Sequence, residues 1–156
     1  MRGAEKRWKM ILLHVQRSLK DSVYARGTEW LLAIALMMWG PILWNNPELF
    51  ALPQYSQFES LMSQETWAWT CFLLGAGRIG VLLWNGAYRR TPHMRVLLSL
   101  VSMIFWYQIS ISFWMSNMIT ATSPSTWLAA WPVFCMFEFI NIGRAARDAK
   151  IADEAA

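Results

Sequence analysis

Apolar residues dominate four long stretches of the chain, and charged residues gather between them. Two stretches, residues 30–47 and 96–119, hold no charged residue at all. Residues 66–88 hold one charge, Arg78, and the last stretch holds one, Glu138. A helix needs roughly 20 apolar residues to cross about 30 Å of hydrocarbon, and it satisfies its own backbone hydrogen bonds there. The pattern therefore predicts an all-α polytopic membrane protein with four transmembrane helices in an antiparallel bundle, at residues 29–47, 66–88, 96–119 and 126–143.

The connections between these stretches differ in charge, and this difference predicts the orientation. Residues 1–28 form a basic segment, and residues 89–95 form a basic loop. Residues 48–65 hold three glutamates and no basic residue, and the turn at 120–125 is uncharged. Because cytoplasmic loops carry the excess of Lys and Arg, we expect both termini, including the tail at 144–156, in the cytoplasm.

The overall composition favours a membrane protein and argues against other classes. Hydrophobic residues make up 56% of the 156 residues and charged residues only 15%, whereas soluble domains carry about 25% charged residues. The two cysteines lie in predicted spans and form neither a zinc set nor a disulfide framework. The two histidines lie far apart, and no nucleophile motif is present. We expect a non-enzymatic protein without cofactor, metal or nucleic-acid partner, and with the lipid bilayer as its surroundings.

The basic segment before the first span has the periodicity of an amphipathic helix. Apolar residues from Trp8 to Val23 recur at helical spacing, and basic residues lie away from them. A basic amphipathic helix with a tryptophan is typical of a segment that lies on an anionic leaflet. This favours membrane-surface binding through Trp8, Lys9, Arg17 and Lys20. The alternative is a helix packed beneath its own bundle.

Residues 75–80 read G-A-G-R-I-G, which matches the glycine spacing of a dinucleotide-binding loop. That loop follows a strand and needs an acidic residue about 20 positions later, whereas these glycines lie inside an apolar stretch. We interpret the small residues as sites of close helix packing. The predicted packing positions are Ala76, Gly77 and Gly80 in the second span and Ser112 and Ser116 in the third.

Arg78 and Glu138 lie inside predicted spans, where a charged side chain costs at least about 3 kcal/mol. Each lies 12 residues from the predicted outer end of its span, and Gln108 of the third span lies 11 residues from its own. At about 1.5 Å per residue, the three share one layer. In one interpretation Arg78 and Glu138 form a buried ion pair, and Gln108 satisfies the remaining donors. In the other, the three line a polar path for an ion, a proton or a small solute. The first is favoured, because few other polar residues follow the spans.

Aromatic residues and the acidic connector give less specific predictions. Most tryptophans lie near predicted span ends, where aromatic belts occur, but Trp39, Trp106 and Trp114 lie deeper. We interpret the connector at 48–65 as a structural element along the outer surface, with a short interfacial helix after Pro53. A ligand-binding loop is the alternative.

Four short segments of residues 66–150 form a familiar set. They are N-G-A-Y-R-R-T-P-H-M-R at 85–95, F-W-Y-Q at 105–108, W-P-V at 131–133 and G-R-A-A-R-D-A at 143–149. Together they resemble a group of small four-span membrane proteins encoded by tailed phages and prophages, which are described only as membrane proteins or holin candidates. The resemblance implies a phage or prophage source and the inner membrane of the bacterial host as location.

Three hypotheses about function follow. The first is a non-enzymatic inner-membrane protein that acts through helix packing, either with itself as a homo-oligomer or with another phage or host membrane protein. The second is a holin that permeabilises the membrane for lysis. The third is a small transporter or channel that uses Arg78 and Glu138.

Overall fold

Long helices form most of the structure, a computed structural model that describes residues 26–87, 91–120 and 130–154. They are α2 (Gly27–Asn45), α4 (Gln64–Ala87), α5 (Pro92–Thr120) and α6 (Ala130–Glu154). Between α2 and α4 lie two short 3₁₀ helices and one helical turn, which are η1 (Leu49–Ala51), η2 (Pro53–Tyr55) and α3 (Ser56–Glu59). No strand occurs within these ranges, so the all-helical prediction is confirmed for them.

Three of the long helices have the length and composition to cross a membrane. They are Gly27–Asn45, Gln64–Asn85 and Pro92–Ile119. α6 is not among them, because its second half, after Gly143, is rich in charged residues. The described residues thus contain three candidate membrane-spanning helices. The predicted fourth span at 126–143, whose first four residues lie outside the described part, is not confirmed.

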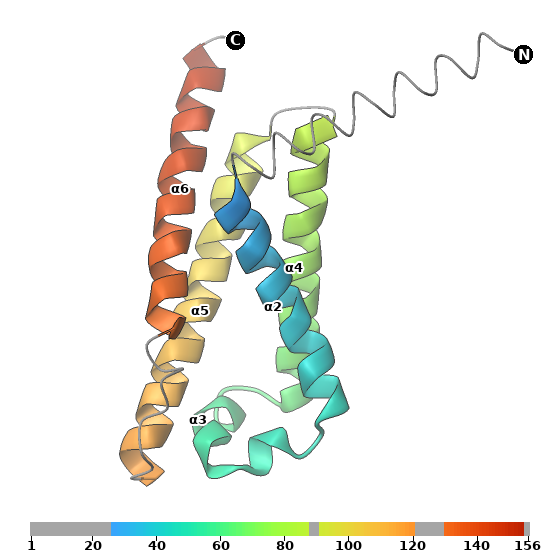
Figure 1. Ribbon diagram of the computed structural model, residues 1–156, viewed down its shortest axis with the longest axis vertical. Helices are drawn as coiled ribbons and strands as arrows, with labels where there is room; N and C mark the ends of the chain where they lie inside the picture. The colour runs from blue at the N-terminus through green and yellow to red at the C-terminus, as the bar shows by residue number, and fades with distance from the viewer. Residues whose placement is uncertain (1–25, 88–90, 121–129, 155–156) are drawn as a thin grey trace, which may run out of the picture.

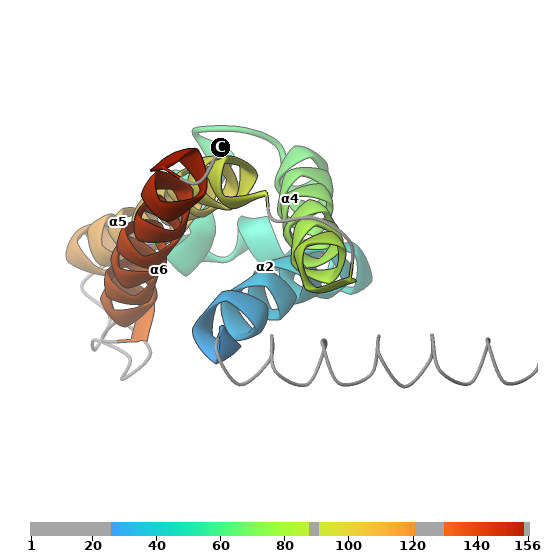
Figure 2. The same ribbon diagram turned by 90° about the horizontal axis from the view of Figure 1, so that it is seen from above.

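The long helices form two pairs. α2 packs along α4 and α5 packs along α6, whereas the contacts between the two pairs are fewer. In Figure 1 the four helices run up and down one common axis, with α5 and α6 on one side and α2 and α4 on the other. The view from above in Figure 2 shows the same division. The contacts between the two pairs therefore determine whether the four helices form a single bundle.

Two glycines allow α2 and α4 to approach each other closely. A Cβ atom on Gly75 would lie 2.6 Å from Cα of Met37 and 2.7 Å from the carbonyl oxygen of Ala33. A Cβ atom on Gly40 would lie 2.7 Å from Cβ of Phe72. These separations are well below van der Waals contact, so only glycine fits at either position without moving a helix.

Gly77 and Gly80, two of the packing positions predicted on α4, do not pack against another described helix of this chain. Both are exposed, and nothing lies within 4 Å of a Cβ atom built on either of them. The reason is helical phase, because two residues turn the helix by about 200°. Since Gly75 faces α2, Gly77 faces outward. Ala76 is half-buried.

The contact between α5 and α6 uses mostly small or polar side chains. Its buried positions on α5 recur every three or four residues: Arg95, Ser99, Ser102, Trp106, Ile109, Ser112 and Ser116. Those on α6 follow the same spacing: Glu138, Asn141, Ala145 and Ala149. Small side chains let helices pack closely in lipid. The predicted packing residues Ser112 and Ser116 belong to this buried face.

The acidic connector folds back against α5 at one end of the bundle, below α2 and α4 and beside the lower part of α5 in Figure 1. Its rings at Phe50 and Phe58 are buried, and burial raises the pKa of the Tyr55 hydroxyl above its usual value. Gln64 holds the connector to α2. Its Nε2 donates to the carbonyl oxygen of Leu43 at 2.7 Å, and its Oε1 accepts the Phe50 N–H at 3.0 Å. The connector is thus part of the core.

Two predicted elements lie outside the described residues. The amphipathic helix with Trp8, Lys9, Arg17 and Lys20 falls within residues 1–25, and most of the turn predicted at 120–125 falls within residues 121–129. The basic loop predicted at 89–95 is shorter than expected, because α5 begins at Pro92.

Candidate functional site: buried charges between two helix pairs

Arg78 of α4 and Glu138 of α6 form an ion pair that crosses from one helix pair to the other. Arg78 Nη1 bonds Glu138 Oε1, and Arg78 Nη2 donates to Glu138 Oε2 at 2.9 Å. The pairing is bidentate, the geometry in which guanidinium and carboxylate bind most specifically. Their side chains are 3% and 0% exposed. The structure thus brings together the two charges that the sequence places in one layer.

Two serines of α5 complete this site. Arg78 Nη1 donates to Ser102 Oγ at 2.5 Å, and Ser102 Oγ donates to Glu138 Oε1 at 2.6 Å. Ser99 Oγ lies 3.4 Å from Arg78 Nη2. A buried charge is tolerated when its hydrogen-bonding capacity is met. The serines therefore reduce the cost of holding the pair between the helices.

Asn141 of α6 connects the site to α2, the long helix that supplies neither the ion pair nor its serines. Asn141 Nδ2 lies 3.4 Å from Glu138 Oε2, and Asn141 Oδ1 accepts a hydrogen bond from Thr28 Oγ1 of α2 at 2.7 Å. We call these connected residues the central network: Thr28, Arg78, Ser99, Ser102, Glu138 and Asn141. Every long helix contributes to it.

A second ion-pair group lies where α2 and α5 begin. Arg95 donates through Nε to Glu29 Oε2 at 3.0 Å and through Nη2 to Glu29 Oε1 at 2.5 Å. Its Nη1 donates to Asp148 Oδ2 of α6 at 2.6 Å. Arg95 and Glu29 are each 3% exposed, whereas Asp148 is 48% exposed. These three residues are the end network, and they join α2, α5 and α6.

The two networks adjoin each other. A void of about 10 Å³ lies between them, and its lining includes Glu29, Arg95, Arg78 and Ser99. That volume is at the lower limit for one water molecule. The two networks therefore lie next to each other, from the middle of the bundle to the end where α2 begins.

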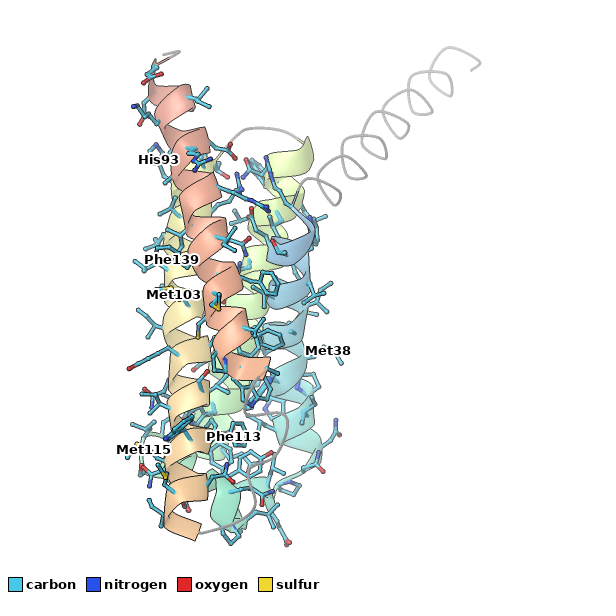
Figure 3. The ribbon with its side chains drawn as sticks, turned by 60° about the vertical axis from the view of Figure 1, so that its left-hand side comes forward. Met38, His93, Met103, Phe113, Met115 and Phe139 are labelled. Carbon is cyan, nitrogen blue, oxygen red and sulfur yellow. The ribbon has the colours of Figure 1, made fainter. Side chains whose placement is uncertain are left out.

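Aromatic side chains join the helix pairs at the opposite end. Trp39 of α2 lies 5.5 Å from Trp131 of α6 and 6.4 Å from Phe113 of α5, measured between ring centroids. Phe58 of α3 packs edge-on against Phe113 at 5.0 Å. These four rings are the aromatic cluster, and Phe113 is labelled near the base of Figure 3. Trp106, fully buried and stacked on Trp131, lies between the cluster and the central network. Trp106 thus separates the central network from this end, where the buried side chains of α5 include Ser112 and Ser116.

Gln108 does not join the ion pair. It is half-buried, and its Nε2 lies 3.4 Å from Ser112 Oγ on its own helix. Ser102 occupies the role predicted for it. The two positions are six residues apart on α5. Six residues rotate the helix by about 600°, so the two side chains point in directions about 120° apart. The two positions also differ by about 9 Å along the helix axis, so depth counting misplaces both the layer and the face on α5.

Sequence reasoning assigned no site role to Glu29, Arg95, Ser99 or Ser102. The sequence predicts a loop at 89–95 and a span that begins at residue 96. In the structure α5 begins at Pro92, so Arg95 lies in the first turn of the helix. A signal was present, since Arg95, Ser99 and Ser102 follow each other at spacings of four and three along one helical face. Extending that face from Ser112 and Ser116 toward the N-terminus of the helix would have found all three.

No group of three or more His, Cys, Asp or Glu side chains that could hold a metal occurs in residues 26–87, 91–120 and 130–154. Cys71 is buried and Cys135 half-buried, both as free thiols. The central and end networks can hold their arginine and carboxylate side chains in fixed positions between the helices.

Comparisons with known protein families, with curated proteins and with solved structures find no match to this chain. The likeness to phage-encoded membrane proteins therefore stays a prediction from the sequence.

Proposed function

We propose that this protein is a non-enzymatic, phage- or prophage-encoded protein of the bacterial inner membrane that acts through helix packing. Its central network serves as an internal lock that fixes how the α2–α4 pair sits on the α5–α6 pair. The observation that carries this proposal is the bidentate ion pair of Arg78 and Glu138 inside one chain. Because each charge binds the other, and serine and asparagine side chains bind the remaining groups, the pair suits a structural role.

A transport path is less well supported by the same geometry. Such a path needs an uninterrupted line of polar groups toward both faces of the membrane. Here Trp106 and Ile109, both fully buried, lie between the central network and the buried serines Ser112 and Ser116. The bidentate Arg78–Glu138 pair also leaves each charge occupied by the other. We therefore assign the pair to architecture.

We infer further that α6 is the fourth span. Glu138 lies fully buried opposite Arg78, which supports the same membrane depth for both. Around it, large apolar side chains such as Phe139 and Met136 are 70% and 65% exposed, as expected of a surface that faces lipid. Figure 3 shows Phe139 on α6 and Met38 on α2 on different sides of the molecule.

The outward face of α4 supports action through another helix. Gly77 and Gly80 lie on it with open space around them, between the exposed Leu73 and Trp84. Small residues flanked by large ones suit close packing of helices in lipid. The partner is a second copy of this chain or another membrane protein.

Reporter fusions test the four-span topology. Fusions at Gln54 and Ser123 should report periplasm, and fusions at Thr91 and the C-terminus should report cytoplasm. The matched control is a fusion at Ser125, which stops before α6 and should report periplasm. A C-terminal fusion that reports periplasm like its control would contradict the fourth span.

Induced expression tests the mode of action. A packing protein should leave growth and membrane potential normal over many generations. Abrupt lysis or depolarisation after a delay would instead favour the holin hypothesis. The variant Gly77→Leu, on the outward face of α4, should abolish cross-linking to a partner without loss of the folded chain, whereas unchanged cross-linking would contradict the assigned face.

A further inference from the structure

A small polar cavity opens at the charged end of the bundle. It has a volume of about 150 Å³, and Arg26, Asn85, Pro92, Arg95 and Asp148 line it. Four elements contribute, namely the start of α2, the end of α4, the start of α5 and the second half of α6. We call it the boundary cavity. Its volume is several times the roughly 30 Å³ that one water molecule occupies in the liquid, and it is large enough for a tetrahedral oxyanion.

The wall formed by Asn85 presents a hydrogen-bond donor. Asn85 Oδ1 accepts the backbone N–H of Thr91 at 2.6 Å, which fixes the orientation of the amide. Its Nδ2 is then committed as a donor, and it is buried without a hydrogen-bond partner among the described residues. The Oγ1 atom of Thr91 is likewise buried without a partner in that part of the chain. A buried donor without an acceptor costs free energy, so this wall favours an acceptor.

Two guanidinium groups face the same space. Arg26 and Arg95 both line the boundary cavity. Glu29 occupies Nε and Nη2 of Arg95, which leaves the Nη1 edge directed to Asp148. Asp148 is the only carboxylate that lines the cavity in the described structure, and half of its side chain is exposed. Its carboxylate can turn toward solvent while Glu29 continues to hold Arg95.

The cavity lies at one boundary of the candidate membrane-spanning segments. The first candidate span begins at Gly27, the second ends at Asn85 and the third begins at Pro92, and each of these positions lines the cavity or adjoins a residue that does. This is the level of lipid headgroups. Basic residues at that level attract anionic lipids.

We propose that the boundary cavity binds the phosphate group of an anionic lipid headgroup. Arg26, Arg95 Nη1 and Asn85 Nδ2 donate to the phosphate oxygens, and Asp148 is the internal competitor that occupies Arg95 Nη1 when no phosphate is bound. The site does not depend on whether α6 crosses the membrane, so its failure and the failure of the proposed topology are separable.

Thermal unfolding of the full chain in a neutral detergent, followed by tryptophan fluorescence, measures the binding. A ligand that binds the folded state raises the midpoint temperature in a saturable manner. The probes are dihexanoyl phosphatidylglycerol, dihexanoyl phosphatidylcholine and inorganic phosphate. We expect the phosphatidylglycerol to half-saturate at a concentration about tenfold below the other two, since it alone combines a net negative phosphate with insertion beside the spans.

Two variants with matched controls localise the effect. Asp148→Ala removes the competitor and should lower the half-saturating concentration of phosphatidylglycerol about tenfold. Its control, Asp153→Ala, removes the same charge from an exposed position on the same helix and should leave it unchanged. Asn85→Asp keeps the acceptor for the Thr91 N–H but replaces the donor with a carboxylate, so saturation should disappear. Its control, Asn45→Asp at the opposite end of α2, should bind as the unchanged chain does.

Equal effects of Asp148→Ala and Asp153→Ala, or normal saturation of Asn85→Asp, would overturn the site. Asp148→Ala keeps the test meaningful even if Asn85→Asp fails to fold, because a gain in binding does not arise from unfolding. If inorganic phosphate half-saturates as low as phosphatidylglycerol and both variant effects hold, the phosphate site stands and the lipid is overturned as its source.

Discussion

The two helix pairs meet in two regions of opposite chemistry. In the central and end networks, Arg78 and Arg95 bind carboxylates through directed hydrogen bonds at 2.5–3.0 Å. In the aromatic cluster, Trp39, Phe58 and Phe113 meet at ring-centroid separations of 5.0–6.4 Å. Both regions join α2 to α5 and α6, and the aromatic cluster contains no charged residue.

The difference concerns what each region specifies. A bidentate ion pair has one good geometry, and a shift of one helix by a single residue leaves buried charges without partners. Aromatic rings accept offset and edge-on arrangements over a range of separations. The charged region therefore fixes the register between the pairs, and the aromatic region supplies contact area in whichever register is fixed.

The largest effect is expected from Arg95→Ala. This change leaves Glu29 buried without a cation, and breaking one side of a buried pair costs about 3–5 kcal/mol. The free energy of unfolding in detergent should fall by that amount. Asp148→Ala is the comparison, because its half-exposed carboxylate contributes about 0–1 kcal/mol. Equal losses for the two variants would contradict the division between buried and exposed partners.

An intermediate effect is expected from Gly75→Ala, which changes the α2–α4 pair and leaves both interface regions intact. The new methyl group would lie 2.6 Å from Cα of Met37, and overpacking of this kind costs about 1–3 kcal/mol. Gly77→Ala is the matched control, since its Cβ would meet nothing within 4 Å. Unfolding in detergent should separate them, with Gly77→Ala neutral or stabilised by up to about 1 kcal/mol.

The smallest effect is expected from Phe58→Leu in the aromatic cluster. The change removes ring contacts and some volume at a fully buried position but keeps an apolar side chain, so we expect a loss of about 1–2 kcal/mol as neighbouring rings shift toward the leucine. A thermal unfolding curve with a midpoint lowered by a few degrees is the expected result. A loss as large as that of Arg95→Ala would show that the aromatic region also specifies a unique geometry.

The helices and the Arg78–Glu138 layer could be predicted because they follow from one-dimensional patterns. Apolar length locates helices, and equal depth in two spans brings Arg78 opposite Glu138 without any knowledge of helix rotation. These features depend on position along a helix axis, which sequence spacing gives directly.

The rest depends on which way each helix faces. The sequence indicates Gln108, whereas Ser102 contacts the ion pair, and it does not indicate that Gly75 faces α2. Rotation about a helix axis and the depth of a helix are set by contacts with helices distant in sequence. The connector was missed as a core element for a related reason. Phe58 packs against Phe113 of α5, which lies far along the chain, and Phe50 packs against Phe58, so nothing local in their acidic surroundings indicates burial.

A double-mutant cycle on Arg78 and Glu138 tests the central claim most directly. The four proteins are the unchanged chain, Arg78→Leu, Glu138→Leu and the double variant, with Gln108→Leu as a control at a polar residue outside the network. Each single change should lower the free energy of unfolding by about 3–5 kcal/mol, and the double variant should return to within about 1–2 kcal/mol of the unchanged chain, because no buried charge is left alone. Losses that add in the double variant, with no recovery, would contradict the account of these two residues as the lock between the helix pairs.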